Sequence, residues 1–214
     1  MQRDTAASLE QEYWNMLSNP SHIKRGRDQS EPLSVLYGSD QDSTVIGSGF
    51  PTLRQFTQDR NARATSKTAR DTEIDARYLS SAWNLVNLPT SRGSILQHAP
   101  GRVTGVTSPW LYFGMLYSSF CWHVEDHNLA SISYLHTGAP KSWWGIPGGE
   151  YEKFEHVTKK LTPQLFDETR DIMLQLVTQY DPRMLASRGL QVCHTVHKPG
   201  EFGESFRVIA LFFN

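Results

Sequence analysis

His123 and Glu125 are the residues of this 214-residue chain whose types and spacing point most directly to chemistry. They lie in residues 119–126, a run expected to form a strand, in which side chains two positions apart project to the same face. An imidazole nitrogen beside a carboxylate oxygen suits a divalent first-row metal, and the pair could form two corners of a 2-His-1-carboxylate site for Fe(II). The alternative is a satisfied polar pair within a sheet, because His-x-Glu alone carries little specificity.

Lys141 is the second residue whose setting suggests binding. Residues 131–136 alternate like a half-buried strand, and Gly-Ala-Pro at 138–140 turns the chain. Lys141 follows this turn and Trp143 comes soon after, so the lysine stem is expected to pack on aromatic surface. Its ammonium would then be available to a carboxylate on a small cosubstrate. A snorkelling surface lysine is the alternative.

Strands and helices must position these residues. Residues 110–117 are rich in aromatic and large apolar side chains and predict a buried strand, and residues 191–197 alternate like a strand that returns to the sheet. Periodic apolar residues and capping residues predict helices at 8–17, 149–161, 169–180 and after Asp181, the last one ended by Gly189. In the first of these, one face is expected to carry Leu9, Tyr13, Trp14 and Leu17.

The composition narrows the class of protein. The net charge of −1 gives no global field for DNA, RNA or an anionic membrane, and no apolar run reaches the roughly 18 residues that a membrane span needs. Two cysteines cannot build a disulfide scaffold or a four-cysteine zinc site, which favours a reducing compartment. A chain that is 38% hydrophobic and 20% charged is ordinary for a soluble globular protein.

Longer runs carry a more specific signal. The residues Trp-Leu-Tyr-Phe-Gly-Met at 110–115, Ser-Ser-Phe-Cys-Trp-His-Val-Glu-Asp at 118–126, Ser-Tyr-Leu-His at 133–136 and Gly-Ala-Pro-Lys-Ser-Trp at 138–143 closely resemble the JmjC domain of Fe(II)- and 2-oxoglutarate-dependent histone lysine demethylases. The runs at 159–166, 175–178 and 200–202 resemble its JARID-type branch, as do those at 37–40, 47–51 and 83–89. The resemblance covers about residues 10 to 206.

The resemblance implies a mainly β fold with flanking helices, an incomplete double-stranded β-helix of the jelly-roll or cupin-like type. Residues 1–52 are expected to form an N-terminal helix and strand leading into the JmjC core. Residues 53–77 are polar and are expected to be a mobile surface segment. Residues 78–214 would form the catalytic core, truncated at its C-terminal end.

The resemblance also implies roles for individual residues. His123 and Glu125 would hold the iron, while Lys141 and Tyr37 would clamp the distal carboxylate of 2-oxoglutarate. Tyr112 would line the methyl-lysine pocket, where an aromatic hydroxyl suits a methylated ammonium. The remaining residues match positions that surround the cosubstrate or the metal pocket: Phe120, Ser131, Ser133 and Trp143.

Two departures from the family pattern stand out. Ser133 occupies a position where the family usually has Asn, and a hydroxyl cannot reproduce the paired donor and acceptor of an amide. The family's distal histidine, its third metal ligand, follows the run at 200–202, but residues 203–214 contain no histidine. His194 and His197 differ in strand parity, so at most one is expected to point inward. With two protein ligands, iron would be held weakly and turnover would be weak or absent.

The absence of the last strands would leave an open sheet edge, prone to aggregation or to docking of another strand. Residues 206–213 are apolar and would add to that hazard if they were exposed.

Three functions follow. The first is oxidative demethylation of methylated lysine 4 on the histone H3 tail in the nucleus, with release of formaldehyde, succinate and CO2. The second is a catalytically inactive module that binds histone or chromatin-associated partners, and the third is a related protein or small-molecule hydroxylase. No direct nucleic-acid site and no membrane association is expected. A basic run at 24–27 could serve nuclear import, or be a solvated loop.

Overall fold

The computed structural model describes residues 6–19, 34–53, 76–168, 179–205 and 208–213. The predicted polar segment at 53–77 and the predicted helix at 169–180 therefore fall almost entirely outside the described residues. The chain divides into two compact units. One, the strand-rich unit, comprises residues 1–36 and 114–214, and the other comprises residues 37–113.

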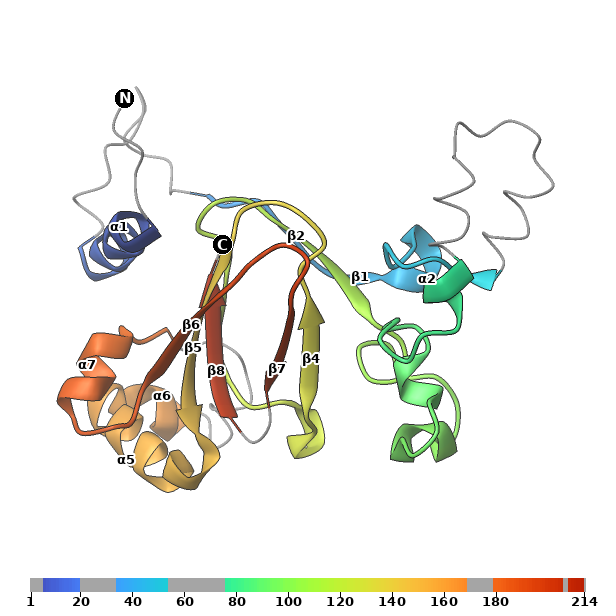
Figure 1. Cartoon of the computed structure of the whole chain (residues 1–214). Helices are drawn as coiled ribbons and strands as arrows, with labels where there is room; N and C mark the ends of the chain where they lie inside the picture. The colour runs from blue at the N-terminus through green and yellow to red at the C-terminus, as the bar shows by residue number, and fades with distance from the viewer. Residues whose placement is uncertain (1–5, 20–33, 54–75, 169–178, 206–207, 214) are drawn as a thin grey trace, which may run out of the picture. The chain divides into compact units, whose positions relative to one another are not determined.

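The strand-rich unit is built on two antiparallel sheets (Figure 1). The larger has the strand order β3-β8-β5-β6, formed by Ser119–His123, Val208–Phe213, Lys141–Pro147 and Cys193–His197. The smaller pairs β4, Ser131–Tyr134, with β7, Phe202–Ser205. This arrangement confirms the mainly β, incomplete jelly-roll fold expected from the sequence.

Strand β8 lies inside the larger sheet. It pairs with β3 on one side, where Ala210 is opposite His123, and with β5 on the other, where Phe212 is opposite Trp143. Residues 208–213 are therefore not at an open edge, because both sides of their backbone are hydrogen-bonded to neighbouring strands. The edges of this four-stranded sheet are β3 and β6.

The unit of residues 37–113 pairs β1, Tyr37–Asp42, with β2, Trp110–Gly114, and carries the short helices α2, Ser43–Ile46, η2, Leu88–Thr90, and η3, Ile95–His98. The expectation of a buried strand over 110–117 is wrong in length and in burial. The strand stops at Gly114, and the side chain of Phe113 is 60% exposed. Each strand of a two-stranded sheet has a single hydrogen-bonded neighbour, so few side chains surround it. The apolar composition of residues 110–117 was therefore not enough to predict that they are buried.

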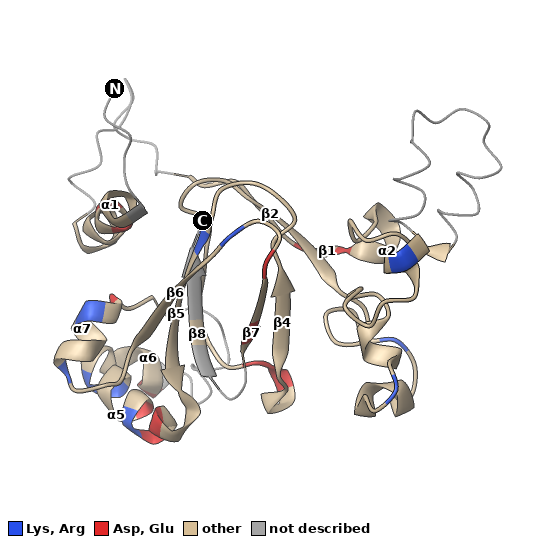
Figure 2. Cartoon of the chain, in the orientation of Figure 1, with Lys and Arg blue, Asp and Glu red and all other residues tan. Residues whose placement is uncertain are grey.

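Four α-helices are found among the described residues of the strand-rich unit: α1, Ala6–Ser18; α5, Tyr151–Leu161; α6, Pro163–Glu168; and α7, Pro182–Ser187. Asp181 caps α7 by accepting a hydrogen bond from the Arg183 amide at 2.8 Å, as its type predicts. Gly189 adopts a φ of +83° after this helix, a conformation that favours glycine. In Figure 2, several charged residues are coloured along α5 and α7. None of the described helices is both long and apolar enough to cross a bilayer.

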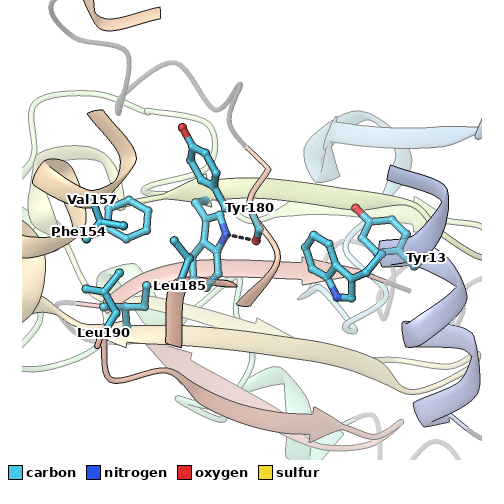
Figure 3. Close-up of a cluster of buried hydrophobic side chains, with 9 residues drawn as sticks. Tyr13, Phe154, Val157, Tyr180, Leu185 and Leu190 are labelled. Atoms are coloured by element: carbon cyan, nitrogen blue, oxygen red, sulfur yellow. Dashed lines mark hydrogen bonds between the residues drawn. The ribbon is translucent and has the colours of Figure 1, made fainter. Parts of the chain in front are cut away.

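The hydrophobic core lies between the larger sheet and the helices, and Figure 3 shows its side chains. Its buried members are Tyr13, Trp14, Trp122, Ile146, Phe154, Val157, Tyr180, Leu185 and Leu190. The indole of Trp122 is fully buried, and its Nε1 donates to the Tyr180 carbonyl at 2.9 Å. Tyr13 and Trp14, on the predicted apolar side of α1, are buried in the core, whereas Leu17, near the end of the helix, is 49% exposed.

The core yields a test of the fold. Phe154 is fully buried, so Phe154→Ala removes a large side chain and leaves a cavity, which should lower the free energy of unfolding by about 3–5 kcal/mol. Phe113→Ala makes the same change at an exposed position and should cost less than about 1 kcal/mol. Urea denaturation followed by tryptophan fluorescence measures both. Equal losses in the two variants would contradict this packing.

Candidate functional site

His123 and Glu125 project toward each other at the end of β3. The distance between His123 Nε2 and Glu125 Oε1 is 3.9 Å, and the side chains are 16% and 33% exposed. The predicted strand over 119–126 is too long, since β3 ends at His123 and a 3-10 turn occupies Asp126–Asn128. Glu125 nevertheless keeps extended backbone angles, φ −65° and ψ 147°, so the two side chains still share one face.

A backbone hydrogen bond sets the orientation of the His123 ring. Nδ1 lies 2.8 Å from the carbonyl oxygen of Cys121. A carbonyl only accepts, so Nδ1 carries the proton, and the lone pair of Nε2 is left on the side of Glu125. This is the second contact that metal-binding histidines usually make. The separation of 3.9 Å is below twice the ~2.1 Å length of metal bonds to nitrogen or oxygen, so one ion can contact both atoms.

A turn with unusual backbone angles follows the pair. His127 and Asn128 have φ values of +55° and +53°, a left-handed conformation that is uncommon for residues other than glycine. The Asn128 amide donates to the Glu125 carbonyl at 3.0 Å, which closes the turn directly behind the carboxylate. The turn therefore fixes where the backbone of Glu125 lies. No pattern in the sequence indicated it.

His123 and Glu125 are two potential ligands rather than three. Within the described ranges, no group of three or more His, Cys, Asp or Glu side chains is arranged to hold a metal ion. His194 and His197 differ in burial, as expected for residues three positions apart in one strand. His197 is 4% exposed, whereas the His194 side chain is 35% exposed and stacks on Trp144 with ring centroids 4.3 Å apart.

A cavity of about 310 Å³ lies between the two sheets of the strand-rich unit. Each strand around it contributes side chains or backbone, among them Ser131, Ser133, Trp143, His197, Gly203 and Ser205. The register places Ser131 opposite Ser205 and Ser133 opposite Gly203, and the two hydroxyls of Ser131 and Ser205 are 2.6 Å apart. The structure thus brings three of the predicted cosubstrate residues, Ser131, Ser133 and Trp143, to one cavity.

Phe120 and Lys141 are not among the residues that line this cavity. The Phe120 ring packs against the His123 ring, with centroids 5.9 Å apart. Lys141 begins β5 opposite His197 of β6, and burial lowers the pKa of its ammonium to about 8. Desolvation disfavours the charged form, so a bound anion would restore it.

Tyr37 and Tyr112 belong to the unit of residues 37–113, whereas the other seven predicted site residues belong to the strand-rich unit. The two phenol rings stack with centroids 6.2 Å apart. The Tyr112 hydroxyl donates to Asp40 Oδ1 at 3.0 Å, and burial raises the pKa of Tyr37. The structure therefore brings these two residues together on β1 and β2.

His197 and Gly203 line the cavity, and sequence reasoning assigned neither of them a role. His197 packs near Trp143, with ring centroids 6.3 Å apart. The parity of His197 in its strand was the only signal available for it. For Gly203 there was none, because its importance depends on which side chain the fold places beside it.

The sequence of the chain is similar to those of known proteins. Residues 110–202 match the family model described as "JmjC domain, hydroxylase". The chain is 40% identical, over 198 residues or 92% of its length, to the lysine-specific demethylase JMJ703 of Oryza sativa subsp. japonica. It has the same identity, over the same number of residues, to the lysine-specific demethylase 5B of Gallus gallus. It is 44% identical over 174 residues, 81% of the chain, to the lysine-specific demethylase JMJ17 of Arabidopsis thaliana.

The chain spans only 14%, 12% and 14% of the lengths of the rice, chicken and Arabidopsis proteins. The range matched by the family model, residues 110–202, includes the His123–Glu125 pair and part of the cavity lining, whereas Gly203, Ser205 and Ala210 of that lining lie beyond it. Residues 110–202 are therefore a JmjC domain, in a chain homologous to lysine-specific demethylases over most of its own length.

Proposed function

We propose that this chain is the core of an Fe(II)- and 2-oxoglutarate-dependent histone lysine demethylase of the JARID type, which acts on methylated lysine 4 of the H3 tail. The observation that carries the proposal is the paired His123 and Glu125, with the imidazole tautomer set by the Cys121 carbonyl. The relatives are named lysine-specific demethylases, which supports the reaction class, and the resemblance of the sequence runs to histone lysine demethylases suggests a histone substrate. Nuclear localisation and chromatin-associated partners follow from that substrate.

Iron would be held by His123 Nε2 and the Glu125 carboxylate. Bound Fe(II) and 2-oxoglutarate would supply the oxidation of an N-methyl group by O2, in which 2-oxoglutarate becomes succinate and CO2 and the methyl carbon leaves as formaldehyde. His123 would bind the metal through the Nε2 lone pair of its neutral form, with Nδ1–H donating to the Cys121 carbonyl. Two protein ligands hold iron less firmly than three, so weak turnover of the 214-residue chain remains a prediction.

The cosubstrate would bind in the cavity between the sheets. Lys141 would pair with its distal carboxylate, helped by the phenol of Tyr37, while Trp143 and Phe120 would wall it. Ser131 and Ser133 would offer hydroxyls in the cavity, where a serine in place of the usual Asn removes one donor. Tyr112 would contact the methylated ammonium. We also propose the division of the chain into residues 1–52, 53–77 and 78–214 as functional segments.

Two other functions each have an observation in their favour. A non-catalytic module that binds histone tails is favoured by the finding that the described residues bring only two metal-binding side chains together. A protein or small-molecule hydroxylase is favoured by the description of the family model. An assay with an H3 peptide trimethylated at lysine 4 distinguishes the three proposed functions. A demethylase releases formaldehyde and succinate, and a hydroxylase leaves a hydroxylated product. A non-catalytic module binds the peptide without release of succinate.

Metal binding tests the two ligands directly. His123→Ala and Glu125→Ala should each weaken Mn²⁺ binding, used as a redox-silent substitute for Fe²⁺, by at least about 100-fold. Loss of a residue that merely orients a ligand already costs about 10–100-fold. Isothermal titration calorimetry measures the affinity. As a control, His98→Ala removes an exposed histidine of the unit of residues 37–113 and should leave the Mn²⁺ affinity unchanged. Unaltered affinity in either ligand variant would contradict the site.

The Lys141 ammonium predicts a pH dependence of cosubstrate binding. Burial lowers its pKa to about 8, so it is charged below that pH and becomes neutral as the pH rises through it. The affinity for 2-oxoglutarate in the presence of Mn²⁺ should be retained below pH 8 and should fall above it. Titration calorimetry between pH 7 and 9 follows the change.

Lys141→Met should abolish both tight binding and its decline with pH, because methionine keeps the length of the side chain without the charge. Lys160→Met makes the same change on the exposed surface of α5 and should behave like the unmodified chain. If the affinity of Lys141→Met for 2-oxoglutarate still fell with rising pH, a group other than Lys141 would be responsible for the pH dependence.

A further inference from the structure

Asp40 departs from regular strand geometry within β1. Its φ of +54° lies in the left-handed region, which is uncommon for residues other than glycine. In a regular strand Asp40 would face away from Tyr37, because residues three positions apart point to opposite faces. The left-handed backbone interrupts that alternation, and the Asp40 carboxylate reaches the hydroxyl of Tyr112 on β2. The Tyr112 ring stacks on Tyr37, so the carboxylate lies beside this pair of phenols.

The contact between Asp40 and Tyr112 has a defined direction. The phenol hydroxyl donates to Asp40 Oδ1 over 3.0 Å, because an ionised carboxylate can only accept. Asp42, the other acidic residue of β1, is engaged elsewhere: it accepts from the Thr44 amide at 2.9 Å. Burial raises the pKa of Tyr37, and the negative charge of Asp40 adds to that effect. Asp40 is therefore the carboxylate of β1 that acts on the two phenols.

The hydrogen bond affects the Tyr112 ring in two ways. Together with Tyr37, stacked at a centroid distance of 6.2 Å, and Trp110, edge-on at 6.5 Å, it helps to hold the ring in one orientation. A hydroxyl that donates to a carboxylate also leaves more electron density on its ring. Such a ring attracts a cation more strongly at its face. Trp110 is 38% exposed, so the cluster is open to a ligand.

We propose that Asp40 is a positioning residue for the binding of methylated lysine. It acts through the Tyr112 hydroxyl, which it orients and polarises, without touching the ligand itself. This inference rests on the proposed function, in which Tyr112 contacts the methylated ammonium. It adds to that function the residue on which the preference of Tyr112 for a methylated over an unmethylated lysine depends.

Substitutions at position 40 separate the hydrogen bond from the charge. Asp40→Gly removes the side chain, and glycine adopts a positive φ without strain, so the thermal unfolding midpoint should stay within a few degrees of that of the unmodified chain. Asp40→Asn keeps an acceptor oxygen and tolerates the same backbone angles, but it removes the charge. Isothermal titration calorimetry with two H3 peptides, one trimethylated at lysine 4 and one unmethylated, gives the ratio of their affinities for each variant.

Asp40→Gly should lower the preference for the trimethylated peptide about fivefold, the effect of one exposed hydrogen bond or cation–π contact. Asp40→Asn should lie between Asp40→Gly and the unmodified chain. Tyr112→Phe removes the hydroxyl alone and should lose as much as Asp40→Gly. The double variant should lose no more than either, because both substitutions break one interaction. As a control, Tyr78→Phe makes the same change at an exposed tyrosine of the same unit and should keep the full preference.

The outcomes distinguish this inference from the proposed function. A preference that persists in Asp40→Gly would overturn the role of Asp40 and leave the proposed function intact. A loss in Asp40→Asn as large as that in Asp40→Gly, or losses that add in the double variant, would show that the carboxylate acts on the ligand through its charge, which also overturns the positioning role. No preference in the unmodified chain would overturn both the contact of Tyr112 with the methylated ammonium and the role of Asp40.

Discussion

The alternation of side chains across the larger sheet is the constraint on which the rest of the strand-rich unit depends. Trp122 enters the core, and its neighbour His123 projects to the opposite face. On β5, Trp144 packs against the core, whereas its neighbour Trp143 lies beside His197. Each of these two strands thus supplies one set of side chains to the core and another to the opposite face of the sheet, and a one-residue shift in register would exchange them.

Strand β8 couples the two strands that carry the charged groups of the site. It hydrogen-bonds to β3, which ends at His123, and to β5, which begins at Lys141. The register between β3 and β8 shifts between Phe120 and His123, so the end of β3 is not a regular continuation of its start. Such irregularities bend a strand and redirect a side chain. The place of His123 in the sheet therefore depends on pairing with a segment almost ninety residues later in the chain.

Local patterns allowed part of this to be predicted. The pairing of His123 with Glu125 followed from the two-residue period, and it holds although the strand ends early, because Glu125 keeps extended angles. The capped helix after Asp181 was equally local. The exposure of Phe113 was not predictable, because burial depends on which strands become neighbours. The conjunction of His197 with Gly203 requires β6 and β7 to meet, and no spacing in the sequence encodes that meeting.

The polar groups around the cavity carry a cost in the protein without ligand. Burial of Lys141 disfavours its charge, and His197 Nδ1 leaves one hydrogen bond unmade. The hydrophobic cluster on the other face of the sheet, with Trp122 and Phe154 fully buried, supplies the stability that tolerates this cost. An anion paired with the Lys141 ammonium would favour its charged form, and β5 already holds this residue in place opposite β6. Preorganisation of this kind converts a local loss of stability into affinity for a ligand of the right charge.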